Sequence, residues 1–211
     1  MPASVFALAG VNGAGKSSIG GAALLARSAA YFNPDLAARD LLASNPGLSL
    51  EQANGLAWET GRRGLAQALQ QGTNFAFETT LGASTIPDLL LAGARQGARV
   101  HVWYAGLASP ELHLRRVRER VQAGGHDIPE ERIRARYDSS RANLIRLLPH
   151  LASLRVCDNG IEADPKAGQA PRPVLLLQMA SGRLVAHIAL GQVPEWAKPI
   201  LTAALTCGTL R

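Results

Sequence analysis

The sequence has few residues that build covalent or metal-linked frameworks, and no long apolar segment. Its only cysteines among 211 residues, Cys157 and Cys207, are too few and too scattered for a disulfide framework or a zinc site. We expect both to be buried thiols. No apolar run approaches the length of a membrane span, and the short N-terminus enters an apolar strand pattern without a signal peptide. We therefore predict a cytoplasmic protein without a membrane partner.

Lysine is also scarce, whereas arginine is concentrated in one segment. The chain has three lysines, Lys16, Lys166 and Lys198. Residues 113–146 contain nine arginines and five acidic residues, so this segment carries +4 of the formal net charge of +6. Acidic residues interrupt the positive ones and aromatic residues are almost absent, which disfavours a nucleic-acid surface. A local role for these arginines fits better.

One stretch has the pattern of a phosphate-binding loop. Residues 10–17, Gly-Val-Asn-Gly-Ala-Gly-Lys-Ser, fit G-x-x-x-x-G-K-[ST] and directly follow an apolar run. Glycines let backbone N–H groups turn toward a polyphosphate, and the N-terminus of a following helix favours the same anion. Lys16 would reach the β- and γ-phosphates and Ser17 would bind Mg²⁺; the alternative is a glycine-rich turn that binds nothing. The predicted nucleotide contacts are Gly10, Asn12, Gly13, Ala14, Gly15, Lys16, Ser17 and Ser18.

Polar side chains follow the second and third predicted strands. Asn33 and Asp35 come directly after the second strand, and Glu78, Thr79 and Thr80 end the third. Doubly wound α/β folds bind their ligands at such strand ends. Asn33 or Asp35 can instead cap the helix that begins near residue 36, and the three residues at the third strand end can cap the next helix. Both interpretations stay open.

Alternating strand and helix patterns over the first 160 residues predict an α/β protein. We expect one domain over residues 1–211, a P-loop NTPase three-layer sandwich with a mostly parallel five-stranded sheet. The helical period of residues 48–71 predicts a long helix that serves as scaffold. A C-terminal β-hairpin and a helix at residues 174–206 extend the sheet edge, and we find no chemistry in them.

Two arginine-bearing helices flank a glycine break at Gly124 and Gly125. The patterns predict helices over residues 110–121 and 130–148. Arginines that close over a transferring phosphoryl group stabilise its charge and exclude water, so we interpret residues 113–146 as a mobile lid. A solvated pair of charged helices is the alternative.

Four segments together resemble the zeta-toxin-like family of P-loop kinases, in the branch of stand-alone bacterial proteins. They are residues 10–17, 33–35, 77–81 and 120–137, in the family's order. The resemblance covers about residues 3–160. It implies an adenylate-kinase-like core, ATP or GTP with Mg²⁺, and phosphorylation of an acceptor hydroxyl, which in zeta toxins belongs to a UDP-activated amino sugar. We identify no antitoxin-binding extension, so an antitoxin partner is not indicated.

The resemblance also implies roles for individual residues. Asp35 would be the general base, and Lys16 would clamp the γ-phosphate together with lid arginines, of which Arg120 and Arg136 are favoured. The implied acceptor contacts are Asn33, Glu78, Thr79 and Thr80. The alternative is a nucleotide-binding ATPase or switch that phosphorylates no acceptor. The chain lacks the Asn-Lys-x-Asp guanine-reading motif and the Leu-Ser-Gly-Gly-Gln transporter signature, and a kinase explains both the base and the lid.

Overall fold

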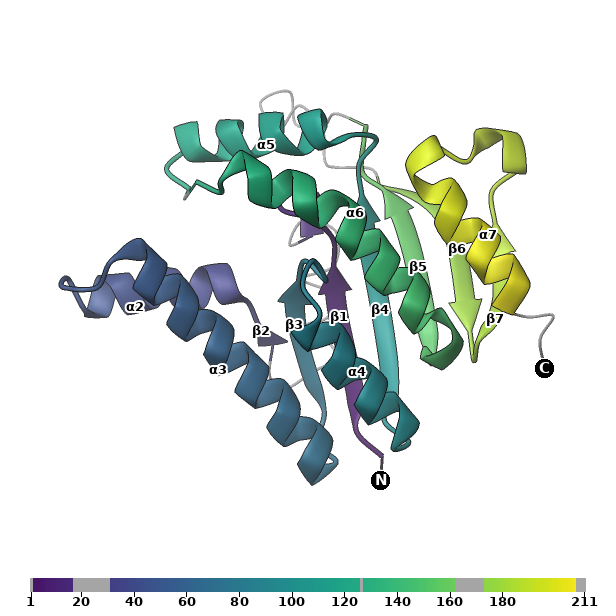
Figure 1. Cartoon of the computed structure of the whole chain (residues 1–211), viewed down its shortest axis with the longest axis horizontal. Helices are drawn as coiled ribbons and strands as arrows, with labels where there is room; N and C mark the ends of the chain where they lie inside the picture. The colour runs from purple at the N-terminus through teal and green to yellow at the C-terminus, as the bar shows by residue number, and fades with distance from the viewer. Residues whose placement is uncertain (1, 17–30, 126, 162–172, 208–211) are drawn as a thin grey trace.

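The computed structural model describes residues 2–16, 31–125, 127–161 and 173–207, which form a single mixed sheet with helices packed on it (Figure 1). The strands are β1 (Ser4–Ala9), β2 (Tyr31–Phe32), β3 (Phe75–Thr79), β4 (Arg99–Gly106), β5 (Ser153–Asp158), β6 (Val174–Ala180) and β7 (Arg183–His187). Their order is β2-β3-β1-β4-β5-β6-β7. The first five pair in parallel, as predicted, and the antiparallel hairpin β6–β7 extends the sheet beside β5.

The described helices begin and end at residues that suit helix termini. They are α2 (Pro34–Ser44), α3 (Leu50–Gln71), α4 (Thr85–Arg95), α5 (Pro110–Gln122), α6 (Glu130–Leu147) and α7 (Lys198–Cys207). A capping box opens α3, because Ser49 accepts from the N–H of Gln52 and the Gln52 side chain accepts from the N–H of Ser49. The helix ends at Gly72, whose φ of 70° suits glycine. The helix expected after Ser17 lies outside the described residues.

Alternate residues of the central strands face the helices and form the main core. In Figure 1, α3, α4, α6 and α7 all lie in front of the sheet. Burial of their apolar side chains contributes about 25 cal/mol per Å² of apolar surface removed from water. The core includes Val5 and Ala7 of β1, Val100 and Val102 of β4, Leu65 of α3, Leu90 of α4, Leu144 of α6 and Ile200 of α7.

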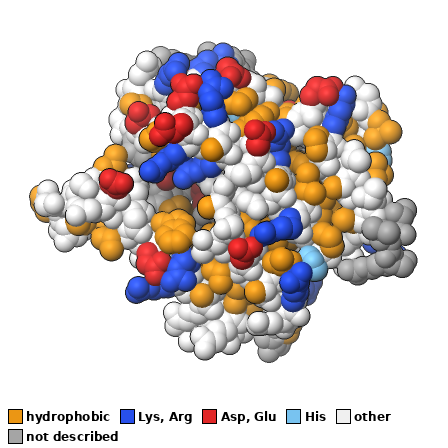
Figure 2. All heavy atoms as spheres, in the orientation of Figure 1, with side chains coloured by type: hydrophobic (Ala, Val, Ile, Leu, Met, Phe, Trp, Pro, Cys, Tyr) orange, Lys and Arg blue, Asp and Glu red, His pale blue; other side chains and the backbone are white. Residues whose placement is uncertain are grey.

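A second apolar cluster holds the two arginine-bearing helices against the loop that follows β1. It consists of Val11, Leu114 and Val117, together with Ile133 of α6, all of them buried. Many of the other charged residues of α5 and α6 lie at the surface, and Figure 2 shows arginines and acidic side chains mixed over the top of the molecule, where these helices lie. Apolar packing therefore contributes to holding the two helices against the loop.

The structure bears on two expectations, one about burial of the two cysteines and one about membrane-spanning segments. Cys157 and Cys207 are free thiols, but both are half-buried, so the expectation that they are buried is wrong. Within the part of the chain that is described, no helix combines the length and the apolar character needed to cross a membrane.

Candidate functional site

The loop after β1 adopts a conformation that depends on its glycines. Gly10, Gly13 and Gly15 have φ values of 137°, 82° and 76°, a region that side chains disfavour. A Cβ on Gly13 would lie 2.7 Å from the carbonyl oxygen of His113, and one on Gly15 would lie 2.4 Å from Nδ2 of Asn159. Both the backbone and its neighbours therefore require glycine, which fits the cradle expected for a phosphate group.

Three side chains from distant elements hold this loop in place. His113 of α5 donates from Nδ1 to the carbonyl oxygen of Asn12 at 2.8 Å, and Arg136 of α6 donates to the Asn12 side-chain oxygen at 2.8 Å. Asn159, which follows β5, donates from Nδ2 to the carbonyl oxygen of Ala14 at 2.9 Å. The loop is thus tied to both lid helices and to the end of β5.

Lys16 is the last described residue of the loop, and both acidic and basic side chains lie near it. Burial lowers the pKa of Lys16, and the carboxylates of Glu78 and Asp35 oppose this shift. The guanidinium groups of Arg120 and Arg136 lower the same pKa further. The sequence placed these five residues far apart, and the fold brings their charges together around the loop.

Asn33 joins the start of α2 to the end of β3. Its side-chain oxygen accepts from the N–H groups of Asp35 at 2.9 Å and Leu36 at 3.1 Å, so Asn33 is the helix cap. Its Nδ2 donates to Oε1 of Glu78 at 3.0 Å, and the Tyr31 hydroxyl donates to the same oxygen. Burial and the bond to Glu78 raise the pKa of Tyr31, which keeps it a donor. Of the two roles left open by the sequence, the structure shows the cap, and contact with the acceptor stays a prediction for Asn33. Glu78 is a fixed, buried carboxylate.

Thr79 and Thr80 shape the turn that follows β3. The Thr79 hydroxyl oxygen accepts from the N–H of Leu81 at 3.1 Å, and that of Thr80 accepts from the N–H of Gly82 at 3.3 Å. Neither residue caps α4, whose cap position is Ser84. The two threonines therefore hold a tight turn at the strand end.

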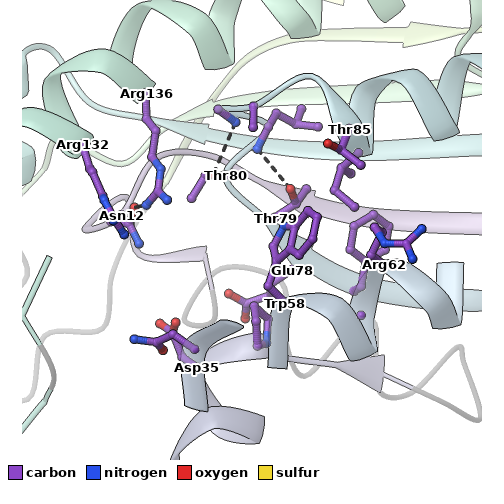
Figure 3. A pocket seen from close by; sticks show the side chains of 18 of the residues that line it. Asn12, Asp35, Trp58, Arg62, Glu78, Thr79, Thr80, Thr85, Arg132 and Arg136 are labelled. Atoms are coloured by element: carbon purple, nitrogen blue, oxygen red, sulfur yellow. Dashed lines mark hydrogen bonds between the residues drawn. The ribbon is translucent and has the colours of Figure 1, made fainter. Parts of the chain in front are cut away.

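A cavity of about 260 Å³ opens between this turn, α3 and α6 (Figure 3). Arg132 and Arg136 enter it from one side, and Asp35 and Trp58 lie on the opposite side. Six predicted site residues are among those that line it: Asn12, Asp35, Glu78, Thr79, Thr80 and Arg136. The cavity adjoins the loop at Asn12, so a small molecule bound there would lie next to a nucleotide phosphate.

Asn33 and Arg120 are not among the described residues that line this cavity. Asn33 holds Glu78 in place. Arg120 lines a neighbouring cavity of about 360 Å³, to which Asp35 also contributes. Arg120 Nη1 lies 3.4 Å from Oδ2 of Asp35. Asp35 therefore stands at the boundary between the two cavities.

Helix α3 forms a wall of the cavity, a position that the prediction of a scaffold helix over residues 48–71 did not include. Asn54, Trp58 and Arg62 line the cavity. Glu59 fixes Arg62 through two bonds of 2.7 Å, to Nε and Nη2. The spacing of four residues, which places Asn54, Trp58 and Arg62 on one helix face, is the signal that would have identified them.

Helix α6 presents its arginines in two directions. Arg132 and Arg136, four residues apart, line the cavity. Arg134 pairs instead with Glu111 at 2.7 Å and Glu130 at 2.8 Å on the exposed surface. Helix α6 therefore has one face that is a solvated charged surface and another that lines the cavity, and the mobile lid stays a prediction.

Ser17 and Ser18, two predicted nucleotide contacts, lie outside the described residues, and Ser17 is also the expected Mg²⁺ ligand. Over the described ranges, no cluster of three His, Cys, Asp or Glu side chains could hold a metal ion. The loop glycines and Lys16 fit a nucleoside triphosphate, and a metal ion bound with it would take most of its ligands from phosphate oxygens and water.

Comparison with known proteins identifies a family for most of the chain. The family model described as zeta toxin matches residues 1–161, about three quarters of the chain. A curated protein of Haemophilus influenzae, described as uncharacterized, is 34% identical over 70 residues, which are 33% of this chain and 50% of that protein. The matched segment thus covers about half the length of this relative.

Two solved structures are similar in fold. The complex of AvrRxo1-ORF1 and -ORF2 with ATP contains a chain with a TM-score of 0.62 and 17% identity, covering 97% of this chain and 64% of that one. A chain of the PezAT toxin–antitoxin system of Streptococcus pneumoniae has a TM-score of 0.50 and 15% identity, covering 75% of this chain and 68% of that one. At such identities the likeness shows the fold alone.

Proposed function

Because the chain belongs to the zeta toxin family, we propose that it is a kinase that uses ATP or GTP to phosphorylate a hydroxyl group of a small molecule. The observation that carries this proposal is the cavity beside the loop, which has Asp35 on one side and Arg136 on the other. A protein that only binds or hydrolyses a nucleotide needs no second, acceptor-sized cavity next to the phosphates. The ATP bound in the similar AvrRxo1 complex supports a nucleoside triphosphate as donor.

On the donor side, the loop and the cationic side chains would bind the phosphates. Loop N–H groups and Lys16 hold the β- and γ-phosphates, and Ser17 would hold Mg²⁺, which neutralises phosphate charge when bound. Arg132 and Arg136 enter the cavity from α6 and would stabilise the charge spread over the transferring group. Positioning and charge stabilisation are the main contributions that a protein makes to phosphoryl transfer.

On the acceptor side, Asp35 would take the proton of the attacking hydroxyl. As the bond from that oxygen to the γ-phosphorus forms, the bond from phosphorus to the β,γ-bridging oxygen breaks and the nucleoside diphosphate leaves. Glu78, fixed by Asn33, would orient the acceptor by accepting from a second hydroxyl. Thr79 and Thr80 would contribute hydroxyl contacts at the same strand end. A UDP-activated amino sugar, the acceptor of zeta toxins, is the first candidate.

A transfer assay on the purified protein tests the proposal. We would incubate it with Mg²⁺ and γ-labelled ATP or GTP and offer nucleotide sugars, nucleosides and small polyols in turn. Label should appear on an acceptor with the native protein and be absent with Lys16→Ala. Nucleoside diphosphate release that no acceptor accelerates would favour the ATPase or switch interpretation instead.

A further inference from the structure

We propose that Trp196, in the C-terminal segment beyond the family match, is a positioning residue for the phosphate-binding loop. The proposal concerns the nucleotide site on which the proposed function rests, and it adds to that site a segment for which the sequence predicts no chemistry. Three observations carry it: a bond from the indole to a strand end, a bond from that strand end to the loop, and a tightly fitted indole.

The first link joins the indole to the end of β5. Trp196 is only 3% exposed, and its Nε1–H donates to Oδ2 of Asp158, the last residue of β5, at 3.1 Å. The other carboxylate oxygen, Oδ1, accepts from the N–H of Gly160. The carboxylate of Asp158 therefore fixes the backbone on both sides of Asn159.

The second link joins Asn159 to the loop. Its backbone N–H donates to the carbonyl oxygen of Gly106 at 3.0 Å, and its side chain is only 4% exposed. From this position Nδ2 donates to the carbonyl oxygen of Ala14 at 2.9 Å and lies against Gly15. Because Asn159 has no room to turn, a displacement of the β5 end moves the loop as well.

The indole packs against the end of β4, and the backbone of Trp196 contacts α6. A Cβ on Gly106 would lie 2.2 Å from its ring, so the absence of a side chain there makes room for it. The carbonyl oxygen of Trp196 accepts from Arg141 of α6 at 3.3 Å, and the Arg141 guanidinium lies 4.1 Å from the ring centroid of Tyr137. Trp196 thus connects the loop to the same helix that carries the cavity arginines.

A role in packing alone would need only an aromatic ring at this position. The hydrogen bond from the indole N–H to the carboxylate of Asp158 fixes the orientation of both groups, and hydrogen bonds to charged groups are among the stronger ones. The substitution Trp196→Phe keeps most of the ring and removes the donor. It therefore separates positioning of the loop from filling of the core.

Hydrogen exchange of the nucleotide-free protein, followed by mass spectrometry, tests the chain of contacts. The reporter is the loop peptide, in which the Ala14 N–H donates to the carbonyl oxygen of Val11 at 3.0 Å. We expect Trp196→Phe to speed exchange there about 3- to 10-fold, as loss of one hydrogen bond would. Asn159→Ala should have at least the same effect, and the double variant should exchange no faster than Asn159→Ala alone.

Trp103→Phe is the matched control, because the Trp103 ring on β4 has the Arg155 guanidinium 5.6 Å from its centroid and makes no described hydrogen bond to the loop. It should leave exchange in the loop unchanged. Unchanged loop exchange in a folded Trp196→Phe protein would overturn the proposal, and so would additive effects in the double variant. Calorimetry with Mg-ATP is run in parallel, with affinity expected to fall about 3- to 10-fold in Trp196→Phe. If the native protein binds no ATP, the proposed function fails, while the exchange data still decide the role of Trp196.

Discussion

Asp35 is the carboxylate on which the proposed transfer depends, and its surroundings allow it to be substituted without loss of the fold. It lies in the first turn of α2, but the cap of that helix is Asn33. Its side chain is 46% exposed, and one of its partners is Arg120, 3.4 Å away. A surface ion pair of this kind contributes at most about 1 kcal/mol to stability. Removing the charge of Asp35 should therefore leave the fold intact.

Asp35→Asn should lower acceptor phosphorylation about 10²- to 10⁴-fold, the usual range for a positioned general base. Mg-ATP affinity and melting temperature should change little, because the amide has nearly the shape of the carboxylate. Asp40→Asn on the same helix is the control, since its side chain is 76% exposed and pairs only weakly with Arg39. Full activity in a stable Asp35→Asn protein would move the base assignment to Glu78, the buried carboxylate at the end of β3.

Lys16 is the second residue with a sharp expectation. Lys16→Ala and Ser17→Ala should each abolish transfer, because both side chains act on the phosphates and on the ion bound with them. Lys198→Ala provides the control, since Lys198 forms a local pair with Glu195 on the C-terminal surface. Transfer rates and nucleotide affinity measured on all three variants test this. Activity retained in Lys16→Ala would refute the phosphate-binding loop.

At the level of elements, α5 and α6 differ from a plain charged surface in how their arginines are placed. Arg136→Ala should lower kcat more than it weakens ATP binding, because the charge that Arg136 faces is greatest in the transition state. Arg120→Ala should do the same through its contact with Asp35, the proposed base. Arg134→Ala, on the same helix as Arg136, should do neither, since Arg134 pairs with Glu111 and Glu130 at the surface. Steady-state kinetics and ATP titrations on the three proteins provide the comparison. Equal losses of rate and of affinity would make Arg120 and Arg136 ordinary binding residues.

The long helix α3 shows where sequence reasoning succeeds and where it stops. Apolar periodicity predicts its extent to within two residues. They could not show that its polar face, with Trp58 and Arg62, lines a cavity. Whether this face of α3 lines a cavity depends on which neighbouring elements pack against it, and tertiary packing decides that.

For the whole molecule, the phosphate-binding loop and the parallel strands followed from local patterns, since a glycine-rich turn and apolar runs carry their own signals. The position of the C-terminal segment did not. Trp196 and Asp158 are 38 residues apart, and no periodicity predicts that an indole will meet that carboxylate. Residue pairs that are distant in the sequence meet only when the strands take their order in the sheet. No local sequence pattern predicts that order.

One such long-range contact predicts how stability depends on pH. His113 is 1% exposed, and because a carbonyl oxygen can only accept, its Nδ1 carries the proton donated to Asn12. Burial lowers the pKa of His113 to about 4, although the bond to Asn12 opposes the shift. An unfolded chain would protonate the same ring near pH 6.5. Between these values the unfolded state binds a proton that the folded state does not.

The contribution of His113 to stability is therefore complete above about pH 6.5 and is lost progressively as pH falls toward 4, by up to about 3 kcal/mol. His113→Asn places an amide donor near the same carbonyl oxygen but cannot titrate, so its free energy of unfolding should fall less over that interval. Urea unfolding of both proteins at pH 7.0, 5.5 and 4.5 measures the difference. Carboxylates and His101 titrate in both proteins and cancel in the comparison. If the two proteins lose the same free energy of unfolding between pH 7.0 and 4.5, burial does not hold His113 neutral in the folded protein, and this prediction is wrong.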